Sequence, residues 1–259
     1  MATKSISQYN GISAYNLQLN GTDTREINGF YSPNAIVQNS LIYSYDPANP
    51  DSYDGTGTTL FDLKSSNNLT LNGGVESSYN QAGFFEFDKV NDVILNGGGS
   101  FPSNDFSMGM WVKTPANFNG IQAIGGVVNN QFNGWVIYTN SVNLVFRATD
   151  GSNLRVLIFP FSTYPLATDT WYYLGYSWLN TSALINAYIY DSTGLLYSQA
   201  SATGGSFNIS GNYNNLITII GSNVYYSDYG YGEVHFYQTN MPQSTYDRNY
   251  DNTKARYGY

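Results

Sequence analysis

From residue 41 onward, short runs of apolar and aromatic residues alternate with clusters of Gly, Asn, Asp and Ser. Runs of this kind, rich in aromatic and β-branched residues and bounded by turn residues, are typical of strands. Strands are expected at 41–45, 84–87, 93–95, 106–112, 121–128, 135–139, 144–148, 154–159, 171–178, 185–190, 195–199, 216–220 and 233–237. Segment 88–92 is interpreted as the turn of a hairpin. Turn signals about every ten residues predict an all-β protein, a two-sheet antiparallel jelly-roll β-sandwich.

The two ends of the chain differ from this pattern. Residues 1–40 are polar and have no long alternating run, which indicates an extended N-terminal arm. Near the other end, Pro242 precedes a segment with Tyr246 and Tyr250 spaced i, i+4. That arrangement predicts a short C-terminal helix with one aromatic face. We therefore expect an arm at 1–40, serving anchoring or assembly, and a sandwich domain at 41–259.

Composition narrows the classes of protein further. Aromatic residues are 17% of the chain, with 25 Tyr, and charged residues are only 11%. This excludes helical bundles and coiled coils and argues against intrinsic disorder. A net charge of −8 argues against nucleic acid or a membrane as partner, because both favour basic surfaces. The absence of Cys excludes disulfides and Cys-ligated zinc.

Several segments, taken in order, resemble one family. LIYSYDPANPDSYDGTGTTLFDL (41–63), FDKVND (87–92), FSMGMWVK (106–113), TWYY (170–173), GEVHFY (232–237) and NYDNTKARYG (249–258) are similar to motifs of the concanavalin A-like lectin/glucanase superfamily. The similarity is to its laminin-G-like and pentraxin-like jelly-roll branch. In FDKVND, Lys89 stands where the similar motif has Gly. The opening and closing motifs together resemble structural proteins of tailed phages.

The resemblance implies a non-enzymatic protein of a virion surface, a capsid decoration, head fibre or tail-fibre component. We expect it to contact other virion proteins through the arm, to assemble as a homo-oligomer or in many copies, and to bind host-cell glycans. The sequence begins without an apolar signal-peptide core, so synthesis in the host cytoplasm is expected. Two alternatives stay open: a bacterial carbohydrate-binding or adhesion module, and a degenerate glucanase.

Residues for acid–base catalysis are scarce. The chain has four Glu, and none has the acidic partners of the glucanase pattern. The single His, His235, lies in an expected strand, and no Gly-x-Ser-x-Gly elbow is present. These observations predict a protein that is not an enzyme.

Calcium is the one cofactor considered, and none is required. Asp88, Asn91 and Asp92 place three oxygen-bearing side chains in one turn, and calcium binds such oxygens. The alternative interpretation is that these side chains bond their own backbone, as Asp and Asn do in tight turns.

A tyrosine-dense segment is the candidate contact surface. Residues 224–232 alternate Tyr with Gly, Ser and Asp, which favours an exposed loop over a core strand. Exposed Tyr rings stack on sugars and also serve protein interfaces. The candidate residues for glycan or partner contact are Tyr225, Tyr226, Asp228, Tyr229 and Tyr231, with Trp135 at the start of another strand.

Overall fold

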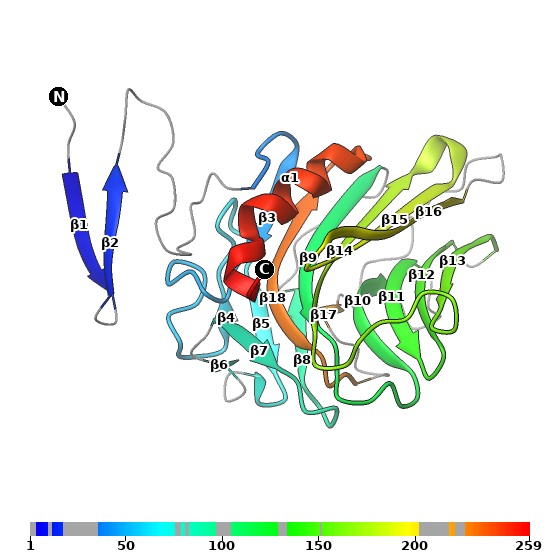
Figure 1. Cartoon of the computed structure of the whole chain (residues 1–259), viewed down its shortest axis with the longest axis horizontal. Coiled ribbons are helices and arrows are strands. Elements are labelled where there is room, and N and C mark those ends of the chain that lie inside the picture. The colour runs from blue at the N-terminus through cyan, green and yellow to red at the C-terminus, as the bar shows by residue number, and fades with distance from the viewer. Residues whose placement is uncertain are drawn as a thin grey trace.

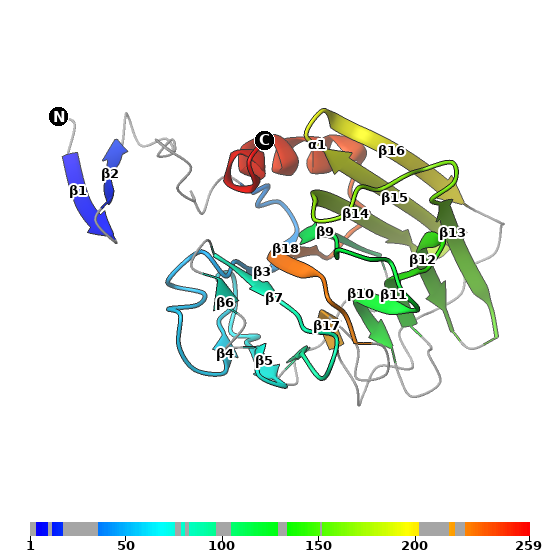
Figure 2. The same cartoon turned by 60° about the horizontal axis from the view of Figure 1, so that its bottom comes forward.

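The computed structural model describes residues 36–75, 79–80, 83–96, 105–128, 134–150, 152–201 and 226–259, with the strand segments 4–9, 12–17 and 218–220. Two antiparallel sheets face each other, and the one α-helix of the described residues covers the outer side of one sheet (Figures 1 and 2). The expected all-β sandwich with a short C-terminal helix is confirmed.

The first sheet runs in the order β13-β12-β11-β10-β17-β8-β5-β4. Its strands are β4 (Thr59–Leu60), β5 (Leu69–Asn72), β8 (Val93–Asn96), β10 (Gln122–Val128), β11 (Gly134–Asn140), β12 (Asn143–Thr149), β13 (Leu154–Pro160) and β17 (Thr218–Ile220). Alternate residues of β12 and β13, such as Phe146 and Phe159, enter the core between the sheets. This alternation is the reason that the strand pattern is readable from the sequence.

The second sheet runs β16-β15-β14-β9-β18-β7-β6, and β3 also pairs with β18. Its strands are β3 (Leu41–Tyr45), β6 (Tyr79–Asn80), β7 (Phe84–Glu86), β9 (Phe106–Lys113), β14 (Trp171–Leu179), β15 (Leu184–Asp191), β16 (Gly194–Ser201) and β18 (Gly230–Tyr237). A 3-10 helix, η2 (Asn180–Ser182), lies between β14 and β15. Every residue of β18 is buried, so this strand is covered on both faces.

The C-terminal segment provides the cover for the second sheet. Helix α1 (Gln243–Thr253) and the 3-10 helix η4 (Lys254–Tyr257) follow β18 directly. Trp111 stacks on Tyr257 with ring centroids 4.3 Å apart, and Tyr246 and Tyr250 pack beside them. The molecule therefore has a second, tyrosine-rich core between the helix and the sheet, in addition to the core between the sheets. Much of the tyrosine in the chain is explained by these two cores.

At the N-terminus, β1 (Lys4–Tyr9) and β2 (Ile12–Leu17) form an antiparallel hairpin that pairs with none of the other described strands. Figure 1 draws this hairpin apart from the sandwich. Ile36, which lies in the segment expected to be the arm, is 1% exposed and belongs to the second core. None of the described helices is long and apolar enough to cross a membrane.

One expectation about local topology is wrong. Segments 84–87 and 93–95 were expected to form a hairpin, but β7 lies in the second sheet and β8 in the first. Residues 88–92 therefore cross from one sheet to the other. Sequence spacing does not distinguish a tight hairpin turn from a short crossing of this kind, because both need the same turn residues.

Candidate functional site

Four segments meet at one end of the sandwich, and we call this surface the rim: residues 88–91, 117–122, 140–142 and 226–228. Lys89 donates from its backbone N–H to the carbonyl of Ser227, and Gly120 donates to Ser141 Oγ at 3.1 Å. Three of these segments lie in connections between one sheet and the other. The rim therefore combines side chains from both sheets, as loop-built binding surfaces do.

Of the predicted calcium residues, Asp88 and Asn91 lie on the rim and Asp92 follows it, and oxygens of the two Asp side chains accept from backbone N–H groups of their own turn. Asp88 Oδ1 accepts from the N–H of Val90 at 2.8 Å, and Asp92 Oδ2 accepts from the N–H of Asp88 at 3.0 Å. Asp92 is buried, whereas Asp88 and Asn91 are exposed. Within the described residues, no group of three or more His, Cys, Asp and Glu could hold a metal ion. These contacts match the alternative interpretation, in which the Asp side chains bond the backbone of their own turn. Calcium binding stays a prediction.

Lys89 has an unusual backbone conformation in the same turn. Its φ is 62°, in the left-handed region that favours glycine, which is the residue of the similar motif at this position. A non-glycine residue there costs on the order of 1 kcal/mol and such residues concentrate at functional sites. The Lys89 ammonium reaches across the rim and donates to the carbonyl of Asn119 at 2.5 Å. A charged group is thus held in a fixed position at the surface.

Asp228 lies opposite this lysine. Its backbone N–H donates to Gln122 Oε1 at 3.1 Å, which joins segment 226–228 to segment 117–122. Burial raises the pKa of the Asp228 carboxyl, and the nearby Lys89 charge opposes that rise. Tyr226 is half-buried beside it. The rim thus has an ammonium, a carboxylate and amide groups within one cluster of loops.

Apolar side chains are also exposed here. Val90, Ile121 and Val142 are 66%, 44% and 62% exposed, and each comes from a different segment of the rim. Exposed apolar groups that cluster among polar groups mark interaction sites more often than isolated ones do. The combination suits ligands that have both hydroxyl-bearing and C–H faces, including sugars and peptides.

Three of the predicted contact residues are not at the surface. Tyr229, Tyr231 and Trp135 are 1%, 0% and 2% exposed, so they cannot contact a glycan or a partner in this structure. Tyr231 packs on Phe87 at 4.4 Å between ring centroids, and Trp135 packs on Phe106 at 5.3 Å. These side chains belong to the core. Tyr226 and Asp228 remain on the rim, and Tyr225 lies outside the described residues.

The glycines of this segment have a different role from the one expected. A Cβ on Gly230 would lie 2.9 Å from Lys113 Cβ, and a Cβ on Gly232 would lie 2.3 Å from the Tyr257 hydroxyl. Gly in a strand often marks the close approach of a neighbour. The Gly- and Tyr-rich segment from residue 230 is therefore a core strand, β18, and the expectation of an exposed loop is wrong there.

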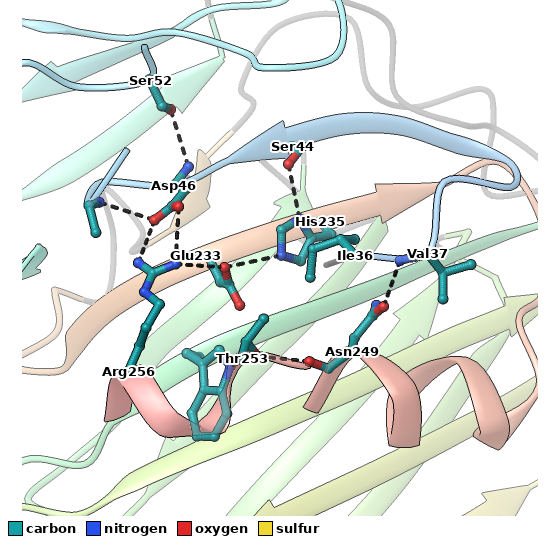
Figure 3. A network of polar contacts seen from close by, with 12 residues as sticks. Ile36, Val37, Ser44, Asp46, Ser52, Glu233, His235, Asn249, Thr253 and Arg256 are labelled. Atoms are coloured by element: carbon teal, nitrogen blue, oxygen red, sulfur yellow. Dashed lines mark hydrogen bonds and ion pairs between the residues drawn. The ribbon is translucent and has the colours of Figure 1, made fainter. Parts of the chain in front are cut away.

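A buried polar network joins the C-terminus to the second sheet (Figure 3). Arg256 donates to both oxygens of Asp46, at 2.6 and 3.0 Å, and to Glu233 Oε2 at 3.1 Å. Both carboxylates are fully buried. His235 lies next to Glu233, with 3.7 Å between Nε2 and Oε2, and its Nδ1 lies 3.1 Å from Ser44 Oγ. Bidentate pairing of this kind fixes the guanidinium geometrically.

The Ser44–His235–Glu233 arrangement resembles the order of a hydrolytic triad, but it is closed to substrate. Ser44 is 3% exposed, and His235 and Glu233 are 0% exposed. A nucleophile must reach the reacting carbonyl, which a sealed hydroxyl cannot do. The prediction that His235 is a strand residue is confirmed by its place in β18.

Electrostatics within the network differ between the two carboxyls. Burial raises the pKa of Asp46, and the Arg256 charge only partly offsets this. Burial also acts to raise the pKa of Glu233, but the adjacent His235 ring and the Arg256 charge bring that pKa below its ordinary value. The two buried carboxylates therefore share one guanidinium, that of Arg256, as a cationic partner.

Sequence reasoning missed this network and the role of Lys89. Asp46 and Arg256 are 210 residues apart, so no local pattern connects them. One signal was present: Glu233 is a lone acid in an otherwise apolar strand, and a buried carboxylate needs a cationic partner. For Lys89, the signal was its substitution for the glycine of the similar motif.

Taken together, the facing antiparallel sheets, the covering helix and the mixed rim define a β-sandwich domain of the lectin-like, jelly-roll type. Residues 66–200 match the family described as "Clostridium neurotoxin, N-terminal receptor binding". This chain belongs to that family. A search of curated proteins found no match.

Solved structures with this fold include receptor-binding domains of botulinum neurotoxins. The serotype D ligand binding domain in complex with N-acetylneuraminic acid has a TM-score of 0.59 and 15% identity, over 82% of this chain and 50% of that chain. The binding domain of neurotoxin DC in complex with SialylT has a TM-score of 0.58 and 16% identity, over 83% and 52%. The type G receptor binding domain has a TM-score of 0.54 and 15% identity, over 82% and 51%. This chain spans about half the length of these domains.

Proposed function

We propose that this chain is a non-enzymatic adhesion module that recognises cell-surface glycans through the rim. The observation that carries the proposal is the position of Lys89, held at positive φ among exposed apolar side chains and opposite Asp228. Membership of a receptor-binding family supports it, as do the relatives solved with N-acetylneuraminic acid and SialylT.

The chemistry of the rim indicates the kind of glycan. Sialylated sugars have a carboxylate, several hydroxyls and apolar C–H faces. The Lys89 ammonium is suited to the carboxylate, Asp228 and the amides to hydroxyls, and Val90 and Ile121 to the C–H faces. We therefore propose an acidic glycan, with the ammonium of Lys89 recognising its carboxylate.

Titration with sialyllactose and with lactose, followed by NMR shift changes or calorimetry, tests this proposal. We expect sialyllactose to bind, and Lys89→Ala to weaken it about tenfold or more, as loss of a charged hydrogen bond does. Lys64→Ala is the matched control, because Lys64 bonds Gln38 away from the rim. A broad glycan array without any binding, or equal binding by the two variants, would refute the rim as a glycan site.

The second part of the proposal concerns the particle on which the protein is located. The hairpin β1–β2, drawn apart from the sandwich in Figure 1, supports an anchoring arm such as a virion protein of a tailed phage would have. A virion component would co-sediment with phage particles through a density gradient. Recovery of this protein only in fractions free of particles would refute the virion assignment and leave the glycan proposal intact.

A further inference from the structure

The hairpin β1–β2 has fewer partners than a stable β-structure needs. Its strands pair with each other over six residues each, from Lys4↔Leu17 to Tyr9↔Ile12, and with none of the other described strands. A two-stranded hairpin alone is marginally stable in water, and a third strand or a packed face is needed to hold it. Both of its outer edges present backbone groups that can pair with another strand.

Among the described residues the sandwich has five edge strands, the four at the ends of the two sheets and β3, which pairs with β18, and four of the five are protected. β3 has five residues and an irregular register against β18 between Phe236 and Tyr237. β4 and β6 have only two residues each. β16 has an irregular register against β15 between Ile189 and Tyr190, and helix α1 lies near it. Short edges, bulges and covering elements are the usual ways in which proteins block strand addition.

The fifth edge strand, β13, is neither short nor irregular, and no described strand or helix pairs with or covers its outer edge, although Pro160 ends it. It is seven residues long, pairs with β12 in unbroken register from Asn143↔Pro160 to Thr149↔Leu154, and lies near β15 and β16 without a ladder to either. Leu154 and Ile158 are 51% and 48% exposed on it. Its one charged residue, Arg155, bends back to donate to the carbonyl of Leu154. A long, regular, apolar edge of this kind favours pairing with another strand.

We propose that the β1–β2 hairpin of one copy adds to the β13 edge of a second copy, so that the chain assembles by exchange of its N-terminal arms. The added strand extends the first sheet and supplies the third strand that the hairpin lacks. The added strand covers the edge that contains Leu154 and Ile158, and main-chain hydrogen bonds supply the register.

The length of the connecting segment decides which β13 edge the hairpin can reach. Figures 1 and 2 both show β1–β2 and β13 at opposite ends of the molecule. Residues 18–35, which connect the hairpin to the sandwich, span at most about 60 Å when extended. A domain of this size is about 45 Å across, so the arm is long enough to reach β13 of its own copy or of a neighbour, and the test must distinguish the two.

Light scattering on the full chain, over a range of concentrations, tests the proposal. We expect a dimer or a larger assembly, and Ile158→Lys is expected to weaken it about tenfold or more, because it places a charge in the added sheet. Phe61→Lys is the matched control: Phe61 is also 48% exposed but lies at the other end of the first sheet, beside β4. Ser7→Pro should weaken assembly as well, because Ser7 pairs with Ala14 in the hairpin ladder.

Cysteine trapping identifies the contacting elements, because the chain has no Cys of its own. A mixture of Ser7→Cys chains with Val156→Cys chains should form disulfides that join the two kinds of chain, as identified by mass spectrometry. A monomer at all concentrations would overturn the proposal. So would an assembly that Ile158→Lys and Ser7→Pro leave unchanged, since another partner or another surface would then be responsible.

Discussion

Replacement of Arg256 by Ala should be among the most destabilising single changes at a polar residue of this protein. The guanidinium makes contacts of 2.6, 3.0 and 3.1 Å with two carboxylates that are fully buried. The variant would leave both carboxylates buried and facing each other without a cation. Removal of one partner from a buried ion pair costs about 3–5 kcal/mol, a large fraction of the 5–15 kcal/mol typical of whole proteins.

The free energy of unfolding, obtained by linear extrapolation from urea, measures this effect. Tryptophan fluorescence is a suitable probe because Trp111 stacks on Tyr257, the neighbour of Arg256. Lys254→Ala is the control: Lys254 makes an exposed pair with Asp251, worth about 1 kcal/mol or less. Adding Asp46→Asn to Arg256→Ala should recover part of the loss, since one uncompensated charge is then removed. A loss below about 1 kcal/mol, equal to that of the control, would refute the reasoning.

Three further predictions concern pH and the rim. Because the pKa of Glu233 is lowered in the folded state, ionised Glu233 stabilises the fold above its ordinary pKa, and this stabilisation is lost as the pH falls. Urea unfolding between pH 3 and 7 should therefore show that the stability of Glu233→Gln falls less on acidification than that of the unmodified protein. Lys89→Gly should raise the free energy of unfolding by about 1 kcal/mol, because glycine adopts a positive φ without strain, and it should weaken glycan binding. A variant that neither gains stability nor loses glycan binding would contradict the rim proposal. Burial raises the pKa of many of the 25 Tyr, and it raises that of Tyr259 to about 12. Absorbance at high pH should therefore show few tyrosinates until the protein unfolds. Titration of most tyrosines near pH 10 in the folded protein would contradict the two-core structure.

The strands could be predicted because their burial is periodic. Strands such as β12 and β13 alternate between the core and the outer face, and this leaves a pattern in the sequence. β18 could not be recognised in full, because helix α1 covers its second face and the alternation disappears. Its Gly230 and Gly232 resemble turn residues in the sequence, although in the structure they permit close packing.

The rim was only partly predictable. Asp88, Asn91, Tyr226 and Asp228 were selected from local composition, and the structure brings them to one surface because several connections between the sheets meet there. Trp135 was misplaced because a strand start gives no information about which neighbour covers it. In the structure Phe106 and Tyr176, distant in sequence, enclose its ring.

The link between Asp46 and Arg256 also determines when folding can finish. The two residues are separated by 210 positions, so almost the whole sandwich is synthesised before the guanidinium exists to neutralise the two acids. Until then, the aromatic outer face of the second sheet, with Trp111 and Tyr173, has no helix over it. Contacts between distant parts of a chain form slowly. The growing polypeptide therefore exposes this aromatic face until residues 243–257 have been synthesised and can cover it.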